Sequence, residues 1–94
     1  MRTIHKYRLI NIFFDSEVKV EMPRFAQILT LGTQRGIPCI WAIVHTEDKP
    51  ITRTFIIKGT GHDCTDLGDD TPYIGTFFIH QENLVFHVFE KQKP

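Results

Sequence analysis

The chain has 94 residues, 41% of them hydrophobic and 12% aromatic, so we expect one globular domain over residues 1–94 rather than a disordered segment. The 11 basic and 11 acidic residues cancel, which disfavours duplex nucleic acid, because duplex binding needs a concentrated basic face. No apolar stretch approaches the roughly 20 residues of a membrane helix, so we expect no membrane partner.

The first two predicted strands alternate between apolar and polar side chains. Thr3–Leu9 places Ile4, Lys6 and Arg8 on one face of the strand. Glu17–Met22 sets two valines against glutamate and lysine, the pattern of a half-buried strand. Proline has no backbone N–H group, so Pro23 is expected to end this second strand.

A hairpin is predicted next. The segments Phe25–Thr33 and Cys39–His45 flank a connection of four to five residues that contains glycine. Cys39–His45 is apolar on both faces, which indicates a central position in a sheet. Residues 25–31 also fit a short helix, because their apolar side chains recur at spacings of three and four. Both interpretations of that segment stay open.

Three more strands follow, at Arg53–Lys58, Tyr73–Ile79 and Leu84–Glu90, with a four-residue turn between the last two. Seven short strands at intervals of roughly ten residues predict an all-β fold. We expect a small antiparallel β-sandwich or a partly open barrel. A chain of this length buries a modest core, so we also expect a homo-oligomer.

The sequence Gly-Thr-Gly-His, residues 59–62, follows a predicted strand and is the first candidate ligand site. Glycine lets backbone N–H groups approach an oxyanion closely, and Thr60 adds a hydroxyl donor. The alternative is that the two glycines only allow a bend after the strand. Trp41, the single tryptophan, is a candidate to stack on a ligand ring. The candidate ligand-binding residues are Arg53, Lys58, Gly59, Thr60, Gly61, His62 and Trp41.

The loop after His62 carries four carboxylates, at Asp63, Asp66, Asp69 and Asp70. Their order does not fit the EF-hand pattern, so we favour a solvated acidic loop over a cation site. Zinc-type ligands are also too few for a structural site. We therefore expect neither a metal nor a cofactor.

Two further features bear on location and chemistry. The two cysteines, Cys39 and Cys64, are too few for a disulfide framework and suit reduced thiols in a cytoplasm. No serine, cysteine or threonine lies in a recognised nucleophile motif, so we expect no enzyme. A small hydrolase that uses His62 with a neighbouring aspartate is the least favoured alternative.

Several blocks in a fixed order resemble a family of short uncharacterised proteins from bacteriophages and prophages, a domain of unknown function. The blocks are IHKYRL, IPCIWAIV, RTFIIKGTGH, YIGTFF and LVFHVFE. The resemblance carries no catalytic residues onto this chain. It implies an accessory protein in the cytoplasm of an infected bacterium that counteracts host defence. Such a protein sequesters a small (cyclic) nucleotide signal or captures a host defence protein. A structural, assembly or minor virion protein is the alternative.

Overall fold

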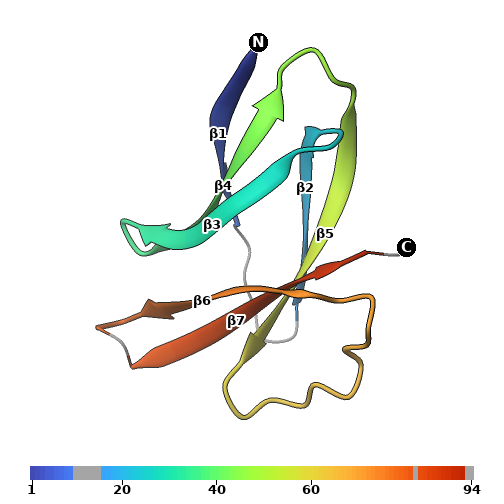
Figure 1. The fold of residues 1–94 in the computed structure, drawn as a ribbon. Coiled ribbons are helices and arrows are strands. Elements are labelled where there is room, and N and C mark those ends of the chain that lie inside the picture. The colour runs from blue at the N-terminus through green and yellow to red at the C-terminus, as the bar shows by residue number, and fades with distance from the viewer. Residues whose placement is uncertain (10–15, 82, 93–94) are drawn as a thin grey trace.

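The computed structural model describes residues 1–9, 16–81 and 83–92, and these form seven strands and no helix (Figure 1). The strands are β1 (Arg2–Arg8), β2 (Ser16–Pro23), β3 (Gln27–Gln34), β4 (Ile37–His45), β5 (Pro50–Gly59), β6 (Tyr73–Ile79) and β7 (Leu84–Lys91). The predicted all-β class is confirmed. Nothing in the described ranges has the helical length and hydropathy that crossing a membrane requires.

The strands form two antiparallel sheets that do not close into a barrel. The three-stranded sheet has the order β1-β4-β3, and the four-stranded sheet has the order β2-β5-β7-β6. As predicted, the strand that contains Cys39–His45 is central, with β1 and β3 on its two sides. Residues 27–34 belong to β3, so the helical interpretation of residues 25–31 is wrong. Pairing with β4 decides that segment, because its local apolar spacing fits either structure.

The inner faces of both sheets contribute to one hydrophobic core. Its buried residues are Leu9, Val18, Met22, Ala26, Ile40, Ala42, Val44, Phe55, Ile57, Phe77, Phe86 and Val88. Phe77 of β6 and Phe86 of β7 are directly paired, and their rings stack with centroids 5.4 Å apart. Alternate residues of β4 and β5 supply much of this core, as period-two strands require.

The β3–β4 hairpin turns more tightly than the sequence suggested. Arg35 and Gly36 alone connect the strands, with φ of 54° and 77°. Two consecutive positive φ angles are the signature of a type I′ turn, whose twist matches that of the flanking strands. The predicted connection of four to five residues was therefore too long. Pro38 lies inside β4, where its carbonyl accepts a hydrogen bond of 2.9 Å from the Leu9 N–H.

The edge strands β3 and β6 lie against each other and join the two sheets on one side. A Cβ atom added at Gly75 of β6 would lie 3.1 Å from the Cβ of Leu31 on β3. The absence of a side chain at position 75 therefore allows this close approach. The register of β6 on β7 also shifts between Tyr73 and Gly75, which bends the strand at the contact.

Candidate functional site

The predicted ligand-binding residues do not gather at one cavity. Trp41 lies on β4 of the three-stranded sheet, while Gly59–His62 end and follow β5 of the four-stranded sheet. Arg53 and Lys58 both belong to β5, but their odd spacing places them on opposite faces. The set therefore divides among three places in the fold.

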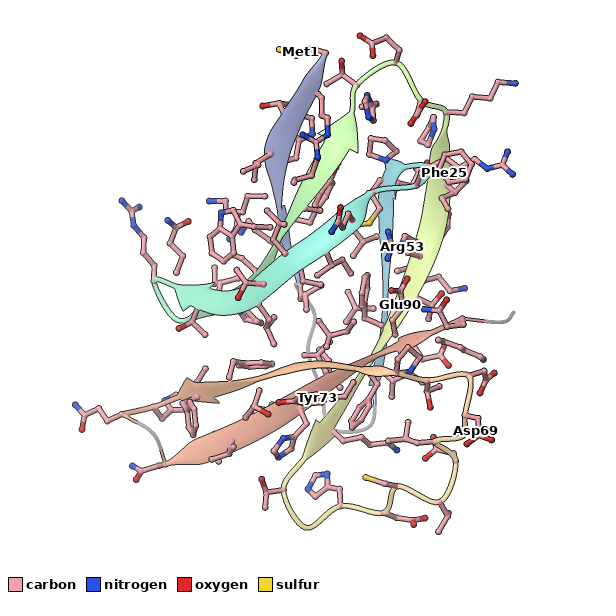
Figure 2. All side chains as sticks on the ribbon, viewed as in Figure 1. Met1, Phe25, Arg53, Asp69, Tyr73 and Glu90 are labelled. Atoms are coloured by element: carbon pink, nitrogen blue, oxygen red, sulfur yellow. The ribbon has the colours of Figure 1, made fainter. Side chains whose placement is uncertain are left out.

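Arg53 forms an ion pair on the inner side of its sheet. Its Nε and Nη2 donate to the two carboxylate oxygens of Glu90 on β7, at 2.6 and 2.8 Å. Its Nη1 donates to the carbonyl of Ala26 at 2.6 Å, so one guanidinium ties β5 and β7 to the start of β3 (Figure 2). The two side chains are only 17% and 7% exposed. Arg53 thus holds the two sheets together at this end of the core.

Lys58 is buried on the outer side of the same strand and anchors the acidic loop. Its ammonium lies 3.0 Å from a carboxylate oxygen of Asp66, and the lysine side chain is 5% exposed. The hydrogen bond from Lys58 lowers the pKa of Asp66. The neighbouring Asp63 accepts from the backbone N–H and the hydroxyl of Thr65, both at 3.1 Å. Within the ranges described, no three His, Cys, Asp or Glu side chains converge as metal ligands do.

The Gly-Thr-Gly-His segment forms a sharp bend that lines a depression of about 360 Å³. The His62 ring packs on Gly59, where an added Cβ would lie 3.1 Å from the ring carbon Cε1, and Gly61 has a φ of 89°. The opposite wall of the depression is Asn83–Phe86. None of the described residues that line it is a lysine or arginine. The predicted bend is present, and the described lining of the depression offers no lysine or arginine to a phosphate.

A chain of side-chain hydrogen bonds crosses the outer face of β5, β6 and β7. The Tyr73 hydroxyl is 2.5 Å from Oγ1 of Thr76, which is 2.9 Å from Nδ1 of His87. Nε2 of His87 is 2.8 Å from Oγ1 of Thr60, whose hydroxyl reaches the Val85 carbonyl at 3.4 Å. One direction of donation satisfies every member when His87 carries its proton on Nε2. Both ring nitrogens are thus engaged by threonine hydroxyls, an arrangement that fixes the three strands to one another.

The outer face of the three-stranded sheet has a different character. Its strands and the turn at 35–36 contain Arg2, Lys6, Arg8 and Arg35 but no aspartate or glutamate. The three cations of β1 are separated by even numbers of residues, so they share one face of the strand. The register places Lys6 opposite Trp41 and Arg8 opposite Cys39 on β4. We call this surface the basic face.

A depression of about 450 Å³ lies at the turn end of the basic face. It is lined by Lys6, Arg8, Gln34, Arg35, Ile37 and Cys39. Lys6 crosses β4 and donates from Nζ to the neutral amide oxygen of Gln34 at 2.5 Å. Across residues 1–9, 16–81 and 83–92, no ion pair joins the depression's three cations to a carboxylate. Within the described part of the chain, these three cations are thus not neutralised by a carboxylate.

Trp41 lies beside this depression on the same face. It directly follows Ile40 of the core in β4 and, by strand alternation, points outward with Cys39 and Ile43. Its indole extends over Gly32 of β3, where an added Cβ would be 3.4 Å from the ring. Among the residues that the structure describes, Trp41 is the predicted ligand-binding residue that lies next to the depression's cations, with Lys6 as its direct partner in the register.

Sequence reasoning missed Lys6, Arg8 and Arg35 as site residues. The signal was present in two forms, the alternation of cations along Arg2–Arg8 and the net positive charge of residues 1–58. Residues 1–58 hold nine Lys and Arg against five Asp and Glu. The missing information was the pairing of β1 with β4, because only that register joins the cations to Trp41.

Comparison with known proteins places the chain in a family. The family model described as "Domain of unknown function (DUF7352)" matches residues 1–94, and the chain belongs to this family. No curated protein and no solved structure matches the chain.

Proposed function

We propose that this member of the DUF7352 family is a non-enzymatic binding protein for a small phosphorylated nucleotide, which it holds on the basic face. One observation carries the proposal. Three cations surround a depression of about 450 Å³ on a sheet face whose strands contain no carboxylate. A volume of several hundred Å³ is typical of sites for small ligands.

The chemistry of the lining favours phosphate as the recognised group. Arg8 and Arg35 offer planar guanidinium groups that bind phosphate oxygens with paired hydrogen bonds. Lys6 adds a third charge, and its hydrogen bond to Gln34 holds it against a second residue of the lining. Cations without carboxylate partners attract an anion over several ångströms before contact is made.

The base of the nucleotide would contact Trp41. The indole lies next to Lys6 in the register, and stacking on an aromatic ring tolerates any base. Phosphate recognition by the cations together with stacking on one ring describes a nucleotide better than it describes inorganic phosphate. The Gly59–His62 bend, predicted from sequence as the anion site, would lie outside this contact.

The biological setting we propose rests on the resemblance to bacteriophage proteins. The protein would be made in the cytoplasm of an infected bacterium and would remove a nucleotide signal of the host defence by binding it. Sequestration requires only affinity and a sufficient number of copies. A small all-β module with charged surface strands suits that task.

Isothermal titration calorimetry against 3′,5′-cyclic AMP, cyclic dinucleotides and ADP-ribose tests the proposal. We expect saturable binding of at least one probe, and a loss of roughly tenfold or more in affinity for Arg8→Glu or Arg35→Glu. Lys49→Glu is the matched control, because it makes the same charge change on an exposed residue of the β4–β5 connection. If Lys49→Glu lowers the affinity equally, the effect comes from the net charge of the protein, and the proposed site is contradicted.

If none of the probes binds, the proposal of nucleotide sequestration is overturned. Capture of a host defence protein would then be the remaining binding function. Mass spectrometry of purified phage particles tests the remaining alternative. A sequestering protein is expected to be absent from the particles, whereas a structural or minor virion protein would be present at fixed copy number.

A further inference from the structure

Among the strands of the described ranges, four lie at sheet edges, and one of these suits pairing with a second copy of the chain. Two edges, β3 and β6, lie against each other. The third, β1, carries Arg2, Lys6 and Arg8, and like charges oppose pairing with its own copy. The fourth, β2, lies at the end of the four-stranded sheet, and across the described ranges no strand pairs with its second edge.

The side chains of β2 alternate between charge and apolar packing. Glu17, Lys19 and Glu21 are exposed on the outer face. Val18 and Met22 are buried on the inner face, at 7% and 1% exposure. The outer face of β2 therefore carries a negative charge at Glu17, a positive charge at Lys19 and a negative charge at Glu21.

We propose that β2 pairs antiparallel with β2 of a second copy, around a two-fold axis at Val20. The axis places Lys19 opposite Glu21 of the second copy, and by symmetry Glu21 opposite Lys19 of that copy. Val18 then lies opposite the second copy's Met22 on the inner face. Opposite charges in directly opposed positions stabilise a sheet, and both such pairs form in this register.

Neighbouring registers are less favourable for simple electrostatic reasons. A two-fold axis at Lys19 would place lysine opposite lysine and Glu17 opposite Glu21 of the second copy. An axis at Glu21 would place glutamate opposite glutamate. An axis at Val18 would oppose Lys19 to Glu17, but Glu17 already has Lys91 as a partner at 3.6 Å. The charges thus select Val20 as the centre.

The dimer would form one continuous eight-stranded sheet from two four-stranded sheets. The contact is isologous and closes after two copies, so no open filament results. The basic face lies on the three-stranded sheet, which does not contain β2. The inference is therefore independent of the proposed ligand, and it specifies how the homo-oligomer expected from sequence would form.

Charge-reversal variants and sedimentation velocity of the purified full chain test the interface. We expect the native protein to sediment as a dimer. Lys19→Glu alone places glutamates opposite glutamates, and Glu21→Lys alone places lysines opposite lysines. Each single variant is expected to weaken the dimer by roughly tenfold or more. Both positions are exposed, and a native-like circular dichroism spectrum is the control for folding.

Mixing the two single variants gives the decisive result. In a mixed dimer each glutamate faces a lysine in both pairs, so an equimolar mixture is expected to form a heterodimer as stable as the native dimer. The Lys19→Glu, Glu21→Lys double variant is expected to form a dimer by itself. A monomeric native protein, a single variant that stays fully dimeric, or a mixture without heterodimer would each overturn the proposal.

Discussion

The carboxylate of Glu90 on β7 accepts two hydrogen bonds from the guanidinium of Arg53 on β5, at 2.6 and 2.8 Å. The residues are diagonal neighbours across the two strands, because Phe55 is the direct partner of Glu90. The third hydrogen bond, to the Ala26 carbonyl, makes the pair a link between the two sheets. An arginine that sequence reasoning assigned to a ligand thus serves the fold.

Replacing one member of this pair leaves the other buried without its counter-charge. We therefore expect Arg53→Met or Glu90→Gln to lower the free energy of unfolding by about 3 kcal/mol. The double variant Arg53→Met, Glu90→Leu is expected to recover most of the loss, because an apolar pair has no buried charge to compensate. Urea denaturation followed by circular dichroism measures all three. If each single variant loses less than about 0.5 kcal/mol of unfolding free energy, a structural role for the ion pair is contradicted.

The Lys58–Asp66 pair predicts a pH dependence of stability. Because Lys58 lowers the pKa of Asp66 below its ordinary value of 3.8, the folded state holds this carboxylate ionised more firmly than the unfolded state does. The contribution is present in full above pH 4 or so and is lost as the pH falls through the folded pKa. Asp66→Asn should therefore lower the urea midpoint at pH 6, by an amount that shrinks below pH 4 or so.

Asp69→Asn is the control for this pH dependence, since Asp69 is exposed in the same acidic loop. At pH 6 this variant is expected to keep a urea midpoint close to that of the native protein. A difference between the Asp66 variant and the native protein that stayed constant with pH would exclude the ion pair as its cause.

The contact between β3 and β6 predicts a strong effect at one glycine. Gly75→Ala introduces a Cβ at 3.1 Å from Leu31, which is tighter than most Cβ contacts in proteins, so Leu31 must shift and the change should cost about 1–3 kcal/mol. Gly32→Ala is the matched change in the other strand, where the added Cβ would lie 3.4 Å from Trp41 in ordinary contact. We expect it to cost less than 1 kcal/mol or so. A larger loss at Gly32 than at Gly75 would contradict the described contact.

The hydrogen-bond chain through His87 predicts unequal effects at its members. Thr76→Val removes the hydroxyl between Tyr73 and His87, and should cost about 1–2 kcal/mol because the half-buried imidazole loses a partner. Tyr73→Phe removes only the exposed end of the chain and should change stability by about 0.5 kcal/mol or less. Thermal unfolding of both variants provides the comparison. Equal losses would show that the chain does not act through His87.

Strand positions were predictable because alternation is a local property of the sequence. Glu17–Met22 and Tyr73–Ile79 were located almost to the residue. The β3–β4 turn was misplaced because Pro38 resembles a turn residue, while Arg35 adopts a left-handed conformation that its type does not indicate. Residues 25–31 were ambiguous because local spacing cannot report the pairing partner that decides between strand and helix.

The candidate site was less predictable, because it depends on which strands become neighbours. Arg53 and Lys58 precede the Gly59–His62 bend in sequence, but strand alternation places their side chains on opposite faces of β5. There Arg53 pairs with Glu90 and Lys58 pairs with Asp66. Lys6 and Trp41 are 35 positions apart and meet only through the β1–β4 register. Such pairing over long sequence separation leaves no local pattern.

Nuclear magnetic resonance can locate the proposed contact between a nucleotide and the basic face residue by residue. The ¹⁵N-labelled protein is titrated separately with ADP-ribose and with a cyclic dinucleotide, and the amide signals and the Trp41 indole N–H are followed. Shifts should concentrate on β1, β4 and the Arg35–Gly36 turn, and should include the Trp41 indole. Shifts confined to Gly59–His62, or no shift with either probe, would rule out nucleotide binding at the basic face.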